Sequence, residues 1–225
     1  MLAGNVPLQE VKNSIVCFKQ QTYKNKELLI INNVNNQTEA GDLKLPKSKL
    51  YRIIDTPSKL TAGLARNIAT TQARGSIIAQ WDTNFWYAPR RLEAQLANMA
   101  EYNAPITLLS RVMSYSYCSG ESYYYSNNNN SILGTIMYIH SLLSITYANQ
   151  DKYEEVELLT RAKSNSIVSL DAPQLACKLH FSSLKPAPPK ASQLNEADFQ
   201  LIADALGLIK GKRRVKTENH SCNQS

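Results

Sequence analysis

The stretch from Gln72 to Arg91, with the sequence QARGSIIAQWDTNFWYAPRR, constrains the fold of this chain most strongly. Its residues 76–81 form a short apolar run without helical periodicity, which is typical of a strand covered on both faces. The polar residues 82–84 follow directly, at the strand end where open α/β sheets bind their ligands. A buried acid at this position is costly unless it binds something, so Asp82 is the first candidate site residue. A helix-capping Asp82 in a tight turn is the structural alternative.

Amphipathic helices and short apolar strands alternate along the first half of the chain. Helices are expected at residues 8–21, 61–73 and 89–102, and strands at residues 27–31, 50–54 and 76–81. This alternation predicts an α/β fold with a Rossmann-like, mostly parallel central sheet and helices on both faces. In the second half, strands are expected at 106–112, 131–139, 167–170 and 174–181, a helix at 153–163, and a long loop at 113–130.

The 225 residues suit one main domain, predicted over residues 1–184. A Pro-rich linker at 185–194 and a C-terminal region at 195–225 follow it. The C-terminal region is predicted to start with a helix capped by Asn195 and to end in a disordered basic tail. The formal net charge of +7 favours anionic partners. A peripheral membrane contact of this helix and tail is one interpretation, and packing of the helix on the domain is the favoured alternative.

Several classes of protein are disfavoured by the sequence. No apolar run approaches the ~20 residues that a membrane-spanning helix requires. No basic segment followed by an apolar one marks a signal peptide after Met1, and the four cysteines show no metal-ligand spacing. We therefore expect a cytoplasmic protein, with membrane association as an addition. A nucleic-acid partner is not expected, because the basic run KGKRRVK lies far in sequence from the tyrosine-rich loop.

Short motifs follow one another in a fixed order along residues 1–181. They are AGN at 3–5, QTY at 21–23, ELLII at 27–31, GLARN at 63–67, ARG at 73–75, WDTNFWYAPRRL at 81–92, GTIM at 134–137, EE at 154–155 and LDAP at 170–173. This ordered set resembles the family 2 glycosyltransferases, which are inverting, nucleotide-sugar-dependent enzymes with a GT-A fold. In that family the first strand is central to the sheet. Here only Met1 and Leu2 precede the first turn, so we expect either that this strand is very short or that the sequence is a truncated piece or has a misassigned start.

The resemblance implies a role for a residue of nearly every motif. It implies Glu155 as the general base and Glu154 as its substitute. The implied nucleotide-binding residues are Gly4, Asn5, Asn32, Asn33, Arg66 and Asp82, and the implied metal ligands are Asp82, Asn84 and His180.

Most of these residues also have a structural interpretation. Taken alone, Glu154 and Glu155 are more typical of a solvated helix face. Arg66 either binds phosphate or fixes a loop through its planar guanidinium group. His180 is either a metal ligand or a packed strand residue. Trp86 is equally suited to an acceptor platform for a sugar ring and to the core.

The chemistry of sugar transfer requires a cation for the leaving diphosphate and a base for the acceptor hydroxyl. The resemblance implies Mg²⁺ or Mn²⁺ as the cofactor, and both prefer oxygen ligands. Asn84 occupies a position where the family usually has an acid, so metal affinity should be lower than usual. Asn32 and Asn33 replace a pair of aspartates, so the preferred nucleotide can differ from uridine.

The sequence therefore predicts a glycosyltransferase that moves a sugar from a nucleotide-diphosphate donor, most readily a UDP-sugar, to a hydroxyl acceptor with inversion. The acceptor expected from the resemblance is a glycan or a lipid-linked sugar. The alternative is a glycosyltransferase-like domain that has lost catalysis and only binds a ligand, because asparagines stand at three customary acid positions.

Overall fold

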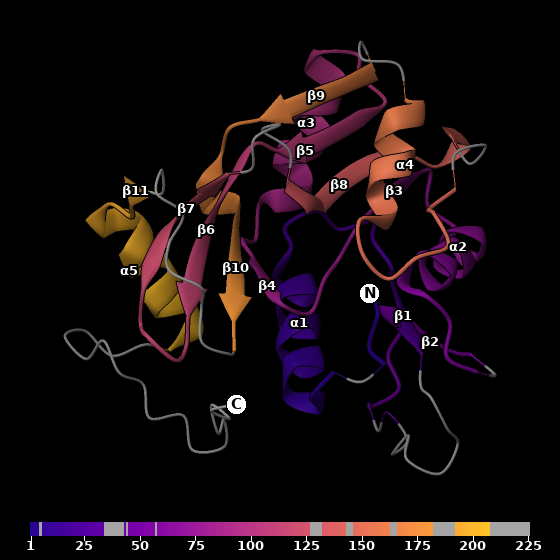
Figure 1. Cartoon of the computed structure of the whole chain (residues 1–225), viewed down its shortest axis with the longest axis horizontal. Helices are drawn as coiled ribbons and strands as arrows, with labels where there is room; N and C mark the ends of the chain where they lie inside the picture. The colour runs from indigo at the N-terminus through magenta and orange to yellow at the C-terminus, as the bar shows by residue number, and fades with distance from the viewer. Residues whose placement is uncertain are drawn as a thin grey trace.

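The computed structural model describes residues 1–4, 6–33, 43, 45–56, 58–126, 132–142, 146–162, 166–181 and 192–207. Within these ranges it confirms the α/β class and most of the predicted elements (Figure 1). The α-helices are α1 (Leu8–Gln20), α2 (Ala62–Gln72), α3 (Arg91–Glu101), α4 (Glu154–Arg161) and α5 (Glu196–Leu206). The strands are β1 (Leu28–Asn32), β2 (Tyr51–Asp55), β3 (Ile77–Ala79), β4 (Phe85–Tyr87), β5 (Ile106–Leu109), β6 (Arg111–Ser116), β7 (Ser122–Ser126), β8 (Ile132–Ile139), β9 (Ile167–Leu170), β10 (Ala176–His180) and β11 (Ser192–Gln193).

The described strands are arranged in three groups of hydrogen-bonded neighbours. These are a β1-β2 pair, a sheet in the order β3-β8-β5-β9, and a sheet in the order β11-β7-β6-β10-β4. The predicted parallel pairing holds for β1 with β2 and for β5 with β9. However, β8 runs antiparallel to both β3 and β5, so the second half is mixed. The reason is that the β6-β7 hairpin reverses the chain, and β8 continues in the reversed direction.

Helices cover both faces of the β3-β8-β5-β9 sheet. The side chains of β5 point alternately to these two faces, and each face carries its own apolar cluster. Ile106 and Leu108 pack in a cluster with Leu158 of α4. Leu109 lies in the larger cluster with residues of α3 and α1, and the Thr107 hydroxyl donates a hydrogen bond to Asn98 of α3 at 2.9 Å. The sheet therefore lies between α4 and α3 (Figure 1). The apolar cluster beneath α4 holds this helix against β5.

The first residues of the chain lie beside β1 as a very short strand-like segment. The Met1 nitrogen donates to the Leu29 carbonyl at 2.8 Å, and the Ala3 nitrogen donates to the Ile31 carbonyl at 2.9 Å. An isolated parallel bridge joins Leu2 to Ile31. A cavity of about 660 Å³ adjoins Met1 and is lined by residues of both β1 and β3. In the part of the chain described, β1 and β3 are accordingly not hydrogen-bonded to each other.

The tyrosine-rich segment is more ordered than the sequence predicted. The loop expected at 113–130 contains the end of β6 and all of β7, which pair as an antiparallel hairpin. The strand expected at 106–112 is divided into β5 and the start of β6. Tyr115 and Tyr123 are 3% and 6% exposed, so these polar aromatic residues serve as core side chains. The remaining residues of the predicted loop, 127–130, lie outside the described part.

The predicted C-terminal helix is present as α5 and packs on the domain beside β7 (Figure 1). The Asn195 side chain caps it by accepting a hydrogen bond from the Asp198 nitrogen at 2.8 Å, as predicted. Ile202 and Ala203 are buried, and the Tyr124 hydroxyl donates to Asp198 at 2.6 Å. Among the described residues, none of the helices has the length and apolarity to cross a membrane. The predicted linker lies largely outside the described ranges, as does the basic tail beyond residue 207.

Candidate active site

The loop that follows β3 is held in place by a buried network of hydrogen bonds and a cation–π contact. The fully buried Arg91 of α3 donates to the Gln80 carbonyl at 3.0 Å, and its guanidinium group lies 4.0 Å from the centre of the Tyr87 ring. The Tyr87 hydroxyl accepts a hydrogen bond from the Asp82 nitrogen at 3.2 Å and donates to the Gly134 carbonyl at 2.9 Å. These contacts join β3, β4, α3 and β8, so the backbone of residues 80–82 has little freedom.

Asp82 lies at the centre of a cluster of polar side chains, as predicted for the end of this strand. Its Oδ1 accepts a hydrogen bond from Arg66 Nη2 at 3.1 Å, and its Oδ2 accepts one from Gln80 Nε2 at 3.1 Å. Asp82 does not cap a helix in these contacts. Gly134 leaves room for the carboxylate, because a methyl group at this position would lie 2.8 Å from Asp82 Oδ2 and 3.0 Å from the Phe85 ring.

Arg66 gathers three carboxylates that are distant in sequence. Its Nε donates to Glu154 Oε1 at 2.9 Å, its Nη2 donates to Asp82, and Glu155 Oε1 lies 3.8 Å from the same Nη2. Burial acts to lower the pKa of Arg66, but Asp82, Tyr147, Glu154 and Glu155 raise it above its ordinary value. The guanidinium group is therefore firmly charged. Its position supports the structural interpretation of Arg66, which fixes α2 to α4.

Glu154 and Glu155 are buried, with 4% and 6% of their surface exposed. The alternative of a solvated helix face is therefore wrong for both residues. Glu155 Oε1 accepts a hydrogen bond from Gln80 Nε2 at 2.7 Å. Burial raises the pKa of Glu155, and the charge of Glu154 raises it further, while Gln80 and Arg66 act to lower it. A carboxylate with a raised pKa is a stronger base than an ordinary glutamate.

The predicted nucleotide-binding residues of the first turn and of the end of β1 lie side by side. Gly4 is required for this approach, because a methyl group there would lie 1.7 Å from the Asn33 carbonyl oxygen. Both amide atoms of Asn33 bind the backbone of Leu60, at 2.7 and 2.8 Å. Asn32 donates to Asp55 Oδ1 at 2.8 Å. Asn5, also predicted here, lies outside the described residues.

Of the three predicted metal ligands, Asn84 and His180 lie on neighbouring strand segments, whereas the side-chain contacts of Asp82 are with Arg66 and Gln80. Asn84 precedes β4, and its carbonyl accepts a hydrogen bond from the Leu179 nitrogen at 2.8 Å. His180 lies next in β10, where its Nε2 is 3.1 Å from the Ser114 hydroxyl. Burial lowers the pKa of His180, and the charge of Lys178 lowers it further. The described residues contain no group of three His, Cys, Asp or Glu side chains placed to hold a metal ion.

The donor chemistry of this set fits only one kind of metal. Asp82 offers one carboxylate and Asn84 one amide oxygen, so most ligands would have to come from water and substrate phosphates. Mg²⁺ and Mn²⁺ bind in this way, whereas a metal that needs an all-protein cage does not fit.

Trp86 belongs to the core. It is 5% exposed and lies in β4 opposite Cys177 of β10, with the apolar residues of α1 in the same cluster. The core interpretation of Trp86 is supported, and its exposed surface is too small to present a platform to a sugar ring.

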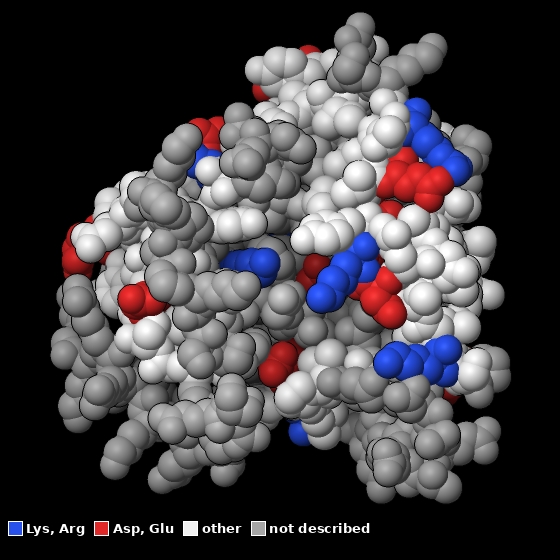
Figure 2. All heavy atoms as spheres, in the orientation of Figure 1, with Lys and Arg blue, Asp and Glu red and all other residues white. Residues whose placement is uncertain are grey.

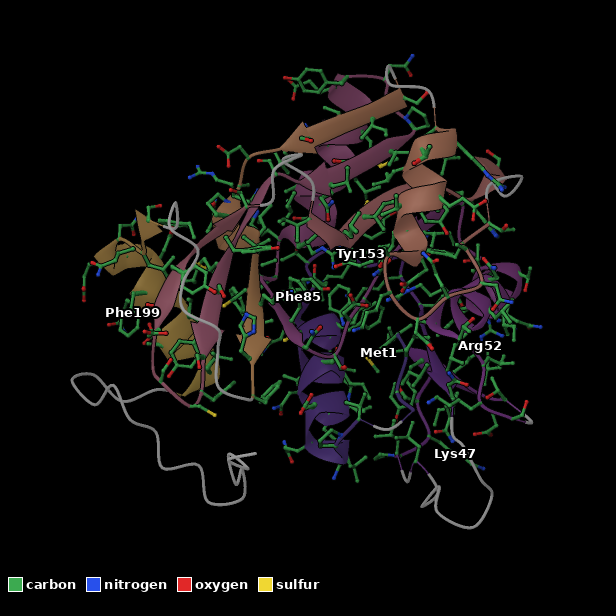
Figure 3. The ribbon with its side chains drawn as sticks, viewed as in Figure 1. Met1, Lys47, Arg52, Phe85, Tyr153 and Phe199 are labelled. Atoms are coloured by element: carbon green, nitrogen blue, oxygen red, sulfur yellow. The ribbon has the colours of Figure 1, made fainter. Side chains whose placement is uncertain are left out.

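Sequence reasoning missed several residues that shape the site, namely Gln80, Tyr87, Arg91 and Gly134 as a neighbour of Asp82. Gln80 sits two positions before Asp82 in an otherwise apolar run, and this spacing on a strand places both side chains on one face. That signal was available. In the view of Figure 3, the labelled Phe85 of β4, Met1 and Tyr153, which precedes α4, surround the centre of the molecule.

Comparison with known proteins agrees with this geometry. A family model described as glycosyl transferase family 2 matches residues 5–163. The uncharacterized glycosyltransferase MJ1057 of Methanocaldococcus jannaschii is 36% identical over 112 residues, which make up 48% of this chain and 38% of that protein.

Solved structures of S. aureus TarS 1-349 share the fold. The complex with UDP has a TM-score of 0.60 at 15% identity, covering 94% of this chain and 65% of that chain. The complex with UDP-GlcNAc has a TM-score of 0.55 at 15% identity, covering 87% of this chain and 63% of that chain. This chain thus spans less than two thirds of the length of these relatives. The likeness confirms the predicted GT-A type of fold, and the family match, which covers more than half of the sequence, shows that the chain belongs to glycosyl transferase family 2.

Proposed function

We propose that this chain transfers a sugar from a nucleoside-diphosphate sugar to a hydroxyl acceptor with inversion of the anomeric carbon. The observation that carries the proposal is the buried cluster of Asp82, Glu154 and Glu155 around Arg66 at the end of β3. Three carboxylates at a strand end are costly to bury, and a single arginine does not neutralise them all. Such a cluster is unfavourable for stability alone, which favours a catalytic purpose.

Glu155 is the proposed general base. It accepts the proton of the acceptor hydroxyl as the oxygen attacks the anomeric carbon, and inversion requires that it act from the side opposite the leaving diphosphate. Its raised pKa suits this task. Glu154 is the proposed positioning residue, because its carboxylate holds Arg66 Nε at 2.9 Å and thereby keeps the guanidinium group between the acids.

The donor is proposed to lie over Asp82. UDP-sugars are the first candidates, because the TarS structures that share this fold were solved with UDP and UDP-GlcNAc. Asp82 and Asn84 are the residues that would hold a Mg²⁺ or Mn²⁺ ion, with His180 as a further ligand. When bound, this ion supplies positive charge to the leaving diphosphate. The acceptor is proposed to be a glycan or a lipid-linked sugar.

A transfer assay with a matched pair of glutamate variants tests this proposal. Purified protein is incubated with UDP-sugars, Mn²⁺ and sugar acceptors, and the product's anomeric configuration is read by NMR. The Glu155→Gln variant should lose about 10²- to 10⁴-fold in turnover, the usual contribution of a general base. Glu157→Gln is the control, because Glu157 lies on the same helix and pairs only with Arg161 in the contacts described. Equal turnover in both variants, or a retained configuration, would contradict the proposal.

A binding domain without catalysis is the second candidate, and one specific observation favours it. Asn33 uses both amide atoms on the backbone of Leu60, and Asn32 is held by Asp55, so these amides fix loops rather than face an empty pocket. This candidate predicts no turnover for any donor and acceptor, and weak or absent nucleotide binding by the folded chain.

A further inference from the structure

The proposed donor site has a deficit of positive charge. Its carboxylates are Asp82, Glu154 and Glu155, and the one cation that contacts them among the described residues is Arg66. A nucleoside diphosphate carries several negative charges, so a site of this composition repels it unless another cation is close.

Lys178 is placed to be that cation. It lies in β10 directly opposite Phe85 of β4 in an antiparallel pair, and residues in such pairs project their side chains to the same face. The Phe85 ring and the Asp82 carboxylate both border Gly134, within 3.0 Å of where a methyl group would stand. A succession of neighbours therefore leads from Lys178 to Phe85, and from Phe85 past Gly134 to Asp82. Figure 2 shows basic and acidic side chains near one another at the centre of this view.

The ammonium group of Lys178 has no carboxylate partner in the part of the chain described. Its Nζ lies 5.5 Å from the centre of the Tyr125 ring. Its side chain projects to the same face of β10 as that of His180, two residues further along the strand. A partly exposed lysine supported by an aromatic ring and by no acid is suited to bind a phosphate as a point charge.

Asn84, which lies next to the strand of Lys178, increases the need for a second cation at the proposed donor site. The backbone carbonyl of Asn84 accepts a hydrogen bond from the Leu179 nitrogen. Because its side chain is neutral, a metal ion is held here with less charge than two acids would supply. We propose that Lys178 binds the diphosphate of the donor and neutralises part of the charge of the leaving group. This inference rests on the proposed function, since it names a residue of the same donor site.

Calorimetric titration of a ligand series separates a phosphate contact from a general effect on the site. Uridine, UMP and UDP are titrated into the full chain and into Lys178→Gln and Lys178→Arg variants, with EDTA and with Mn²⁺. The control is Lys12→Gln, which removes the same charge from an exposed position on α1. Lys178→Gln should weaken UDP binding by roughly tenfold to a hundredfold, as expected for a hydrogen bond between charged groups. Uridine binding should be unchanged, and Lys178→Arg should retain most of the affinity for UDP.

Two results would overturn the inference while leaving the proposed function intact. One is UDP binding by Lys178→Gln that equals that of the unmodified chain. The other is an equal loss for uridine and UDP, which would show that Lys178 supports the fold of the site rather than the phosphates. Absence of UDP binding by the unmodified, folded chain would overturn both proposals together.

Discussion

Removing the guanidinium group of Arg66 should destabilise this protein severely, and the cause can be tested by pH. The Arg66 side chain is 13% exposed, and those of Asp82, Glu154 and Glu155 are 19%, 5% and 8% exposed. Arg66→Met keeps the apolar stem but leaves these carboxylates buried and unpaired. Loss of one partner of a buried ion pair costs about 3–5 kcal/mol. For a domain of this size that corresponds to a fall in Tm of roughly 6–20 °C.

The loss should shrink as the pH falls. In the wild-type protein burial raises the pKa of Glu155 and Arg66 acts to lower it, so the pKa of Glu155 rises further when Arg66 is removed. A carboxyl group with a raised pKa in the folded state binds its proton more tightly there than in the unfolded chain. Lower pH therefore stabilises the variant relative to its state at neutral pH. Calorimetric melts of Arg66→Met at pH 7 and pH 5 should show the smaller difference from wild type at pH 5.

Arg111→Met is the matched control for this experiment. Arg111 also binds a carboxylate, that of Asp171 at 2.8 Å, but the two side chains are 43% and 57% exposed. An exposed pair contributes no more than about 1 kcal/mol. Equal losses in the two variants at pH 7, or a loss in Arg66→Met that does not change with pH, would refute the reasoning.

Three further predictions concern the proposed base Glu155, the glycine beside Asp82, and the C-terminal helix α5. If Glu155 is the base, kcat/KM should rise with pH through an apparent pKa above the ordinary glutamate value, because only the deprotonated form accepts a proton; a pH-independent profile over that range would argue against it. Gly134→Ala places a methyl group 2.8 Å from Asp82 Oδ2, so it should weaken UDP binding in calorimetry, whereas Gly75→Ala, whose nearest neighbour lies at 3.4 Å, should not. Asn195→Ala removes the cap of α5 and should lower the free energy of unfolding by about 1 kcal/mol in denaturant titrations; no change would contradict a stabilising cap by the Asn195 side chain.

The place of Asp82 in the fold was predictable because it depends on local pattern. The apolar run before Asp82 and the polar residues after it place this acid at a strand end, and the structure agrees. The burial of Glu154 and Glu155 was not predictable from the residues alone. It depends on the docking of α4 against Arg66, which is 88 positions away in sequence. Only the resemblance to the family suggested that these acids are more than a solvated face.

The β6-β7 hairpin was missed because its residues are polar by composition. Serine and tyrosine clusters are typical of loops, yet the rings of Tyr115 and Tyr123 are buried here. Ser114 pairs with Tyr123 across the β6-β7 hairpin. Alternation of tyrosine and serine at 114–117 is the period-two signal that would have predicted a strand. The mixed strand directions of the sheet were missed for the same reason. The β6-β7 hairpin reverses the chain before β8, and without predicting it we could not predict that β8 runs antiparallel.

The most direct test of the central claim is a calorimetric titration of UDP, and then of GDP, into the folded chain with and without Mn²⁺. An Asp82→Asn variant run beside it removes one carboxylate of the cluster with little change in volume. The proposed donor site predicts metal-dependent micromolar binding of one nucleotide by the unmodified chain, and a clear loss of that binding in Asp82→Asn. Absence of binding for both nucleotides, or equal binding by the variant, would contradict a donor site at the end of β3.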